Sequence, residues 1–372
     1  MKGILALIIG KLSLDGYFNY GNVLQNYALQ QVLRQYGEVD CLWHDKDNFM
    51  PRTWYMWGWK EYLKYIINWR GSRKNLFSDL HGMEMVRQGK IKDWCDRYIN
   101  LRQAEGKLSQ LADVYDFFVV GSDQVWNPNF SPLEDCFLTF APPEKRVAYA
   151  ASISCPSIPA EKQALYKEGF AGMAHISMRE QQGADTVKEL SGRDVPVVVD
   201  PTLLLTPEEW RKVSRPPAWY HGEDYILTYF LGTRPEIVAR LEQETGLKVV
   251  NLLDEDVYEH YVTGPDEFIW AIEHAKLVYT DSFHGTVFSI LFRTPFVVCN
   301  RVGDGVSEKM GSRIDTLLGY FGLETRRGTK KNGYVIENPL AEPDWSQVDV
   351  VLERERKRSD EYLRQALKVD EV

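Results

Sequence analysis

A histidine in a strand-to-helix turn is the residue of this sequence best suited to acid–base chemistry. The segment TDSFHGT places His284 beside Asp281, Ser282 and Gly285, at the start of an apolar helix. A histidine at a helix start can donate a hydrogen bond to an anion or transfer a proton, although an isolated histidine is more often structural. The polar residues around His284 favour the functional interpretation.

Polar residues also follow the apolar runs of the N-terminal half. The run 116–120 leads directly into Gly-Ser-Asp-Gln, in which Asp123 is suited to act as a base or as a sugar ligand, or to cap a short turn. Ligands of parallel sheets bind at the carboxyl ends of strands, so side chains in such positions are candidates for a site. The further candidates of this kind are Ser122, Gln124, Ser152, Asn19, Asn22 and Gln25, of which the two asparagines have turn or N-cap roles as the alternative.

Two arginines could bind an anion. Arg179 follows a short predicted strand, and Arg313 precedes the predicted helix 314–320. An arginine beside a helix start is a natural fork for phosphate or carboxylate, although Arg179 could instead pair with a neighbouring acid. The sequence has no G-x-G-x-x-G, no P-loop and no metal-like spacing of His, Cys and carboxylates, so we expect no metal and no cofactor.

Short strands that alternate with helices must position these residues. Such alternation is typical of parallel βαβ units, and two series of them predict two Rossmann-like domains of the α/β class. The predicted strands are 4–9, 116–120, 147–150, 195–199, 225–231, 248–253, 277–279 and 296–299, and the predicted helices are 23–36, 235–244, 265–274, 285–292 and 314–320. A further helix is predicted to begin at Thr206-Pro207-Glu208-Glu209, which has the pattern of a capping box.

We divide the chain into three parts. Residues 1–205 form an N-terminal Rossmann-like domain, with a Trp-rich helical insertion at about 48–108. Residues 206–345 form a C-terminal Rossmann-like domain, and residues 346–372 form a C-terminal helix that could pack back on the first domain.

Within the insertion, tryptophans alternate with tyrosines and basic residues. Trp54, Trp57, Trp59 and Trp69 all lie within sixteen positions of the sequence. Packing of these aromatic side chains on the sheet is one interpretation. Contact with lipid headgroups or with a lipid-linked acceptor is the other, because Trp and Lys together favour a membrane surface.

Composition excludes several classes of protein. The chain has 372 residues, of which 44% are hydrophobic and 26% charged, so it is globular and neither disordered nor coiled-coil. Its net charge of −9 argues against a general nucleic-acid binder. Five widely spaced cysteines without Cys-x-x-Cys indicate reduced thiols. No apolar run is long enough to span a bilayer and no clear signal peptide is present, so we expect a cytoplasmic protein, with the inner face of the membrane as an alternative.

The sequence resembles the polysaccharide pyruvyl transferase family. Segments that carry the resemblance run in order from about residue 3 to residue 325, and they read GNVLQNYALQQVL, VVGSDQVWNP, YAASIS, SMRE, DPTLLL and TDSFHGTVFSILFRTPFVV. The resemblance implies two Rossmann-like domains that face each other across a cleft, as in the two-domain GT-B glycosyltransferases. It also implies transfer of a pyruvyl group from phosphoenolpyruvate onto two hydroxyls of a sugar, with formation of a cyclic ketal and release of phosphate.

This chemistry implies a role for each candidate residue. The donor carries a phosphate and a carboxylate, and the residues expected to bind it are Arg179, Ser282, His284, Gly285 and Arg313. Several family members carry an Arg at the position of Ser282, so Ser282 with backbone N–H groups, or Arg313, must replace it here. His284 is expected to transfer a proton or to bind phosphate, and Asp123 to orient or deprotonate a hydroxyl. The residues expected on the acceptor side or in the cleft are Asn19, Asn22, Gln25, Ser122, Gln124, Ser152 and Asp281.

Two alternatives to this function stay open at the level of sequence. One is a glycosyltransferase that uses a nucleotide sugar in the same two-domain architecture. The other is a non-catalytic protein of envelope-polysaccharide assembly.

Overall fold

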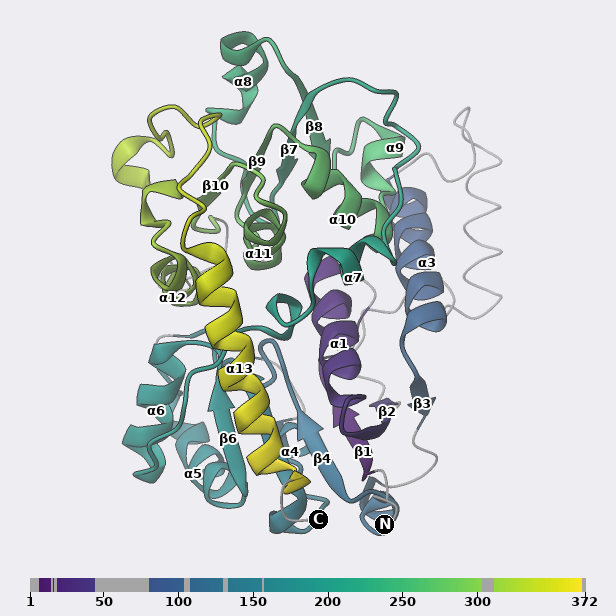
Figure 1. The fold of residues 1–372 in the computed structure, drawn as a ribbon, viewed down its shortest axis with the longest axis vertical. Helices are drawn as coiled ribbons and strands as arrows, with labels where there is room; N and C mark the ends of the chain where they lie inside the picture. The colour runs from purple at the N-terminus through teal and green to yellow at the C-terminus, as the bar shows by residue number, and fades with distance from the viewer. Residues whose placement is uncertain are drawn as a thin grey trace.

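Two parallel sheets, each flanked by helices, build the molecule (Figure 1). The computed structural model describes residues 7–14, 16, 19–43, 80–103, 108–129, 133–155, 157–302 and 311–369. The predicted α/β class with two Rossmann-like sheets is confirmed.

The first sheet, sheet A, has the strand order β3-β2-β1-β4-β5-β6, and each neighbouring pair is parallel. All four residues of β4 are buried, as is usual for a strand covered on both faces, and this is why the strand reads as a continuous apolar run. The strands are β1 (Leu7–Leu12), β2 (Gly37–Trp43), β3 (Leu101–Gln103), β4 (Phe117–Val120), β5 (Arg146–Ala151) and β6 (His175–Met178).

The second sheet, sheet B, has the strand order β11-β10-β9-β7-β8 and is also parallel throughout. Its strands are β7 (Tyr225–Tyr229), β8 (Lys248–Leu252), β9 (Leu277–Thr280), β10 (Phe296–Cys299) and β11 (Arg327–Gly328). The helices of the described residues are α1 (Tyr20–Leu33), α3 (Leu80–Tyr98), α4 (Leu133–Cys136), α5 (Gln163–Ala171), α6 (Gln181–Ser191), α7 (Pro207–Arg211), α8 (Val238–Thr245), α9 (Tyr258–Tyr261), α10 (Pro265–His274), α11 (Phe283–Phe292), α12 (Ser312–Phe321) and α13 (Val348–Ala366), together with the 3-10 turn η4 (Pro201–Leu203).

The structure corrects several predicted boundaries. The predicted strand 195–199 is wrong, because within it only Val197 forms a bridge, with Met178, and Pro196 has no N–H to donate to a ladder. Helix α1 begins at Tyr20 instead of Val23, because Asn19 caps it. The predicted helix after Thr206 does form as α7, with the capping box between Thr206 and Glu209.

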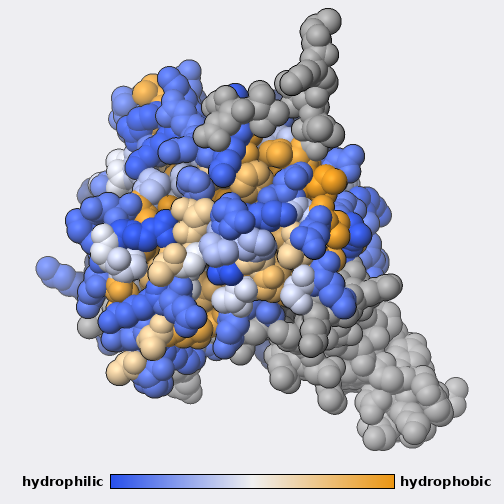
Figure 2. All heavy atoms as spheres, turned by 90° about the horizontal axis from the view of Figure 1, so that it is seen from below, coloured by the Kyte–Doolittle hydropathy of each residue, from blue (hydrophilic) through white to orange (hydrophobic). Residues whose placement is uncertain are grey.

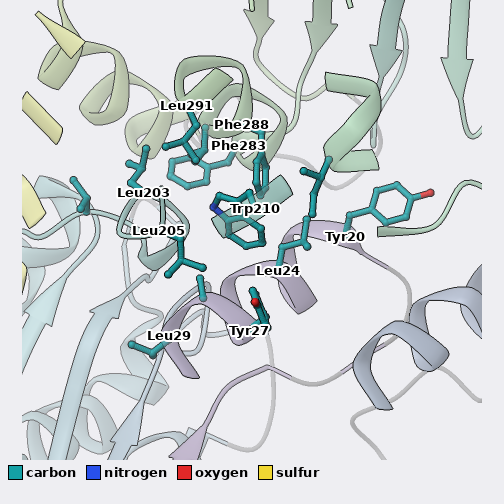
Figure 3. Packing of buried hydrophobic residues seen from close by; sticks show 14 of the residues in the cluster. Tyr20, Leu24, Tyr27, Leu29, Leu203, Leu205, Trp210, Phe283, Phe288 and Leu291 are labelled. Atoms are coloured by element: carbon teal, nitrogen blue, oxygen red, sulfur yellow. The ribbon is translucent and has the colours of Figure 1, made fainter. Parts of the chain in front are cut away.

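One hydrophobic core joins the two sheets. Trp210 of α7 is fully buried and lies where α1 and η4 meet α11 (Figure 3). Its ring centroid is 4.8 Å from that of Phe288 and 5.6 Å from that of Tyr27, and its indole N–H donates to the carbonyl of Thr202 at 3.1 Å. The same cluster of buried residues includes Val119 of sheet A and residues of sheet B. The two halves therefore share their packing.

The C-terminal helix α13 begins beside α12 and runs over the half of the molecule that contains sheet A (Figure 1). Tyr362 donates to the carbonyl of Ala148 in β5 at 2.7 Å. The guanidinium of Arg356 donates to the carbonyls of Leu203 and Leu205, each at 2.9 Å. This helix thus contacts sheet A and the segment that leads from sheet A to sheet B.

Hydrophilic residues dominate the described surface at the end of the molecule nearest the termini, with smaller hydrophobic areas between them (Figure 2). None of the helices in the described ranges has the length and hydrophobicity that a membrane span requires. The tryptophans of residues 54–69, for which we predict packing or membrane contact, lie outside the described residues.

Candidate functional site

The turn between β9 and α11 places His284 in the first turn of α11. Ser282 is the N-cap, and its hydroxyl oxygen accepts the N–H of Gly285 at 3.2 Å. The hydroxyl of Thr286 donates to the carbonyl of Ser282 at 3.0 Å. The S-x-x-G spacing thus folds as a helix start, and it leaves His284 only 6% exposed.

The first turn of α1 lies directly against the imidazole of His284. A Cβ added to Gly21 would overlap Nδ1 of the ring, so a glycine is required for this close approach. Asn19 caps α1, and its side-chain oxygen accepts the N–H of Gly21 at 2.9 Å. Two helix N-termini, one from each half of the molecule, therefore meet at His284.

The loop after β4 presents Asp123 to the same region. The peptide bond between Gly121 and Ser122 is cis, and Asp123 has a φ of 67°. Gln25 of α1 accepts the N–H of Ser122 at 3.0 Å. The carbonyl of Asp123 accepts the N–H of Ser152 at 2.9 Å, which ties the loop to the residue that follows β5. Helix α1 and the β5 loop thus hold this segment from two sides.

Arg179, at the carboxyl end of β6, is committed to two carboxylates. Its NH1 donates to Asp200 Oδ2 at 2.8 Å and its NH2 donates to Asp123 Oδ1 at 3.0 Å. Its guanidinium carbon lies 4.7 Å from the ring centroid of Phe283 in α11, a cation–π contact between the halves. Burial opposes the charge, but the two carboxylates raise the pKa of Arg179 well above its usual range.

Asp200 connects four segments of the chain. Its Oδ1 accepts the N–H of Thr202 at 3.0 Å and the hydroxyl of the same residue at 2.6 Å, which caps η4. Its Oδ2 accepts from Arg179 and from the hydroxyl of Ser122 at 3.3 Å, and lies 3.6 Å from Nε2 of His284. Burial opposes ionisation, but His284 and Arg179 hold the pKa of this carboxyl well below its usual range. Asp200 is therefore an ionised acceptor.

Asp123 is ionised for a similar reason. Burial raises the pKa of this carboxyl, but the nearby cations, Arg179 foremost, hold it below its usual range. A carboxylate with a lowered pKa is a weak base and a good hydrogen-bond acceptor.

Arg313, in the first turn of α12, has a different environment. Among the residues that the structure describes, the carboxylate oxygen nearest to its guanidinium is Asp123 Oδ1, at 3.9 Å. Its guanidinium carbon lies 5.6 Å from the ring centroid of Phe283, and the residue is 8% exposed. Burial, together with the charge of Arg179, lowers the pKa of Arg313 to about 10. The charge of Arg313 is thus poorly balanced by carboxylates, whereas the charge of Arg179 is paired with two of them.

Several buried polar atoms around this cluster have no hydrogen-bond partner among the described residues. Such orphans are rare in native proteins, and a group of them in one cluster is a reason to look for a ligand there. They are Nε of Arg179, Nε of Arg313, Nε2 of His284, Oε2 of Glu180 and Oδ1 of Asn22.

Other residues predicted from the sequence bind the backbone or the side chains of residues that were not predicted. Asp281 accepts the N–H groups of Leu231 and Gly232, each at 2.8 Å, and so holds the loop after β7. Gln124 accepts from the side chain of Asn127 at 2.9 Å. The hydroxyl of Ser152 donates to Glu180 at 3.0 Å. Their contact with a ligand stays a prediction.

Sequence patterns did not select Asp200, Phe283 or Gly21 as site residues. Asp200 carried the same signal as the others, because it directly follows the apolar run 195–199. Gly21 and Phe283 had no such signal, because their roles depend on contact between α1 and α11. Within the described ranges, no group of three or more His, Cys, Asp and Glu residues could hold a metal ion.

Comparisons with known proteins bear on this site. A family model described as polysaccharide pyruvyl transferase matches residues 19–301. The search of the curated proteins gave no match.

Among solved structures, the chain is similar to the UDP-GlcNAc 2-epimerase from Neisseria meningitidis bound to UDP-GlcNAc, with 9% identity over 94% of this chain and 100% of that chain and a TM-score of 0.38. It is also similar to the UDP-GlcNAc 2-epimerase from Methanocaldococcus jannaschii, with 11% identity over 94% and 100% of the two chains and a TM-score of 0.41. A third is a UDP-glucosyltransferase from Polygonum tinctorium, with 11% identity over 98% of each chain and a TM-score of 0.38.

Proposed function

Because the chain belongs to the polysaccharide pyruvyl transferase family, we propose that it transfers the pyruvyl group of phosphoenolpyruvate onto two hydroxyls of a sugar. The sugar is part of a polysaccharide or of a glycolipid precursor, the product is a cyclic pyruvate ketal, and inorganic phosphate is released. The observation that carries this proposal is the match over residues 19–301, since that range includes every residue of the cluster described above except Arg313.

Arg313 is the residue best suited to bind the anionic donor. Both terminal nitrogens of Arg179 already donate to carboxylates, whereas the closest carboxylate oxygen that the described residues offer to Arg313 is 3.9 Å away. The hydroxyl oxygen of Ser282 accepts the N–H of Gly285 in the cap of α11, and its O–H can still donate to the phosphate, but it brings no positive charge. Arg313 is therefore our candidate for the cation that replaces the Arg of other family members, and Arg179 supports the site through Asp123 and Asp200.

His284 and Asp123 are suited to the proton transfers. We assign to His284 the proton that C3 of phosphoenolpyruvate receives, because a buried imidazole beside the carboxylate of Asp200 can take up and release a proton. Asp123 accepts a hydrogen bond from an acceptor hydroxyl and orients it. Its lowered pKa supports this orienting role over that of a strong base.

The reaction balances with these groups. C3 gains one proton and becomes a methyl group, and C2 becomes electrophilic. One hydroxyl oxygen attacks C2 and loses its proton, the bond from C2 to the phosphate oxygen breaks, and phosphate leaves with the electron pair. A second hydroxyl oxygen then bonds to C2 and loses its proton. One of the two hydroxyl protons replaces the proton that was given to C3, and the other leaves with phosphate.

We further propose that the enzyme acts in the cytoplasm without a cofactor, and that it works at the inner face of the membrane if its acceptor is lipid-linked. Contact with the inner face of the membrane would come from residues 54–69, which combine the four tryptophans named above with Lys60 and Lys64. Binding of the full chain to vesicles with and without anionic lipid tests this part of the proposal.

The test of the activity is incubation of the protein with phosphoenolpyruvate and a panel of candidate sugar acceptors. Mass spectrometry of the acceptors and a phosphate assay follow the two products. We expect one acceptor to gain a pyruvyl ketal in step with phosphate release, and the His284→Ala variant to give neither product. Release of phosphate without a modified acceptor, or a product that forms equally with the variant, would contradict the assignment.

A further inference from the structure

We infer that Asp200 holds His284 as the tautomer protonated on Nε2, and that Nδ1, the nitrogen beside Gly21, exchanges the proton with substrate. The identity of the substrate rests on the proposed function, whereas the protonation of the ring does not. Asp200 is thus a positioning residue, which acts through His284.

Asp200 is fixed in position next to Nε2 of His284. Its Oδ2 lies 3.6 Å from Nε2 of His284, and Nε2 is buried with no other partner in the described part of the chain. Asp200 is 1% exposed and is held in place by Thr202, Arg179 and Ser122. A carboxylate can only accept hydrogen bonds, so the nitrogen that faces it is the one that carries a hydrogen.

The contact at 3.6 Å is longer than a hydrogen bond, and it is a contact between the two halves of the molecule. Asp200 precedes η4 beside sheet A, and His284 belongs to α11 beside sheet B. Catalytic hydrogen bonds are often long in the free enzyme and tighten when substrate binds. A shift of a few tenths of an ångström brings Nε2 within hydrogen-bond distance of Oδ2.

The other ring nitrogen of His284, Nδ1, lies at the contact with α1. This nitrogen lies against Gly21 in the first turn of α1, so close that a Cβ added to Gly21 would stand 2.0 Å from it. The next residue, Asn22, has a buried side-chain oxygen without a partner among the residues described. Buried acceptors are nearly always paired in native proteins, so we assign a substrate hydroxyl as the partner of this oxygen, on the residue that follows Gly21.

The tautomer explains how one histidine can serve two steps. When Nδ1 is protonated, the ring is a cation that Asp200 stabilises through Nε2–H. Nδ1 gives its proton to C3 of the donor and the ring becomes neutral, still protonated on Nε2. The first acceptor hydroxyl then passes its proton to Nδ1 as its oxygen bonds to C2, which restores the cation. No proton crosses to Asp200 in this scheme.

The direct test is ¹⁵N NMR of protein with labelled histidine at alkaline pH, where the neutral rings report their tautomers. His284→Ala assigns the resonance among the seven histidines of the chain. We expect neutral His284 to carry its hydrogen on Nε2 in the wild type and to lose this preference in Asp200→Asn, whose amide can donate to Nε2. A wild-type ring protonated on Nδ1, or a preference that is unchanged in the variant, overturns the inference. The wild-type spectrum decides even if the variant does not fold.

A second test uses two matched substitutions of helical glycines. Gly21→Ala places a methyl group on Nδ1, whereas Gly319→Ala adds one at an exposed position of α12 with no close neighbour. Both are expected to keep the circular dichroism of the wild type. Gly21→Ala should lower the turnover of phosphoenolpyruvate about 100-fold or more, in the range of a lost general acid, and Gly319→Ala should not. Full activity of Gly21→Ala overturns the role of Nδ1. If NMR shows the expected tautomer but no pyruvylated product forms with any acceptor, the proposed function is refuted and the assignment of the ring tautomer still holds.

Discussion

Two buried arginines in one cluster should respond in opposite ways to the same substitution. Arg179 and Arg313 both lie against the ring of Phe283, and both are nine-tenths or more buried. Arg179 donates to two carboxylates, whereas the closest described carboxylate oxygen to Arg313 is 3.9 Å away. We therefore expect Arg313→Met to stabilise the free protein and Arg179→Met to destabilise it.

The size of each effect follows from the charges. A pKa for Arg313 lowered from 12.5 to about 10 corresponds to about 3 kcal/mol against the charged form in the folded state. This cost is present in full at neutral pH, begins to fall as the pH rises through about 10, and is gone only above the ordinary value for arginine. Removing the charge should thus raise the free energy of unfolding by at most about 3 kcal/mol, since part of the interaction with Asp123 is also lost. Arg179→Met leaves two buried carboxylates uncompensated, which typically costs about 3–5 kcal/mol.

Urea unfolding of the wild type and both variants at neutral pH measures these effects, with and without phosphoenolpyruvate. A ligand at 100 times its Kd adds about 2.7 kcal/mol to the wild type, and we expect this increment to vanish in Arg313→Met. If Arg313→Met lowers the free energy of unfolding without phosphoenolpyruvate as much as Arg179→Met does, the reasoning is refuted. That result would show that Arg313 is itself a structural ion-pair partner. An undiminished response to phosphoenolpyruvate would remove Arg313 from the donor site.

Three further predictions concern the same site. His284→Ala should abolish phosphate release without a change in the circular dichroism spectrum. Turnover at the wild-type rate would contradict the role assigned to His284. Ser282→Ala removes the N-cap of α11 and should lower the free energy of unfolding by about 1 kcal/mol, as urea titration can measure, whereas no change would mean that the cap is dispensable. The pKa of Asp200 is lowered on folding, so its stabilisation is present above the unfolded value of about 3.9 and is lost as the pH falls further. The stability difference between the wild type and Asp200→Asn should therefore shrink in acid below about pH 4, and a difference independent of pH would contradict the ionised state of Asp200.

Local signals explain which elements could be predicted from sequence. The bounds of α10 and β10 agree with prediction because Pro265 and Pro295 mark their starts and because their apolar residues are contiguous or helically spaced. Strand β2 was not predicted, because Glu38 and Asp40 interrupt its apolar residues. It is still a strand because it pairs with both β1 and β3.

The site shows the limit of such signals. Residues after strands were selected one at a time, and the structure brings His284, Asp123, Arg179 and Arg313 into one cluster. The pairing that distinguishes the two arginines could not be predicted, because the partners of Arg179 are far from it in the sequence and are set by the order of strands in sheet A. The same holds for the glycine of α1 against the imidazole of α11.

The buried cluster around Trp210 has a consequence for how the molecule melts. Because one apolar core contains residues of both sheets, neither half can unfold without exposing the packed surface of the other. Calorimetry should therefore record a single cooperative transition instead of two. A ligand that binds at His284 should raise the temperature of that one transition, so the two halves gain their thermal resistance together.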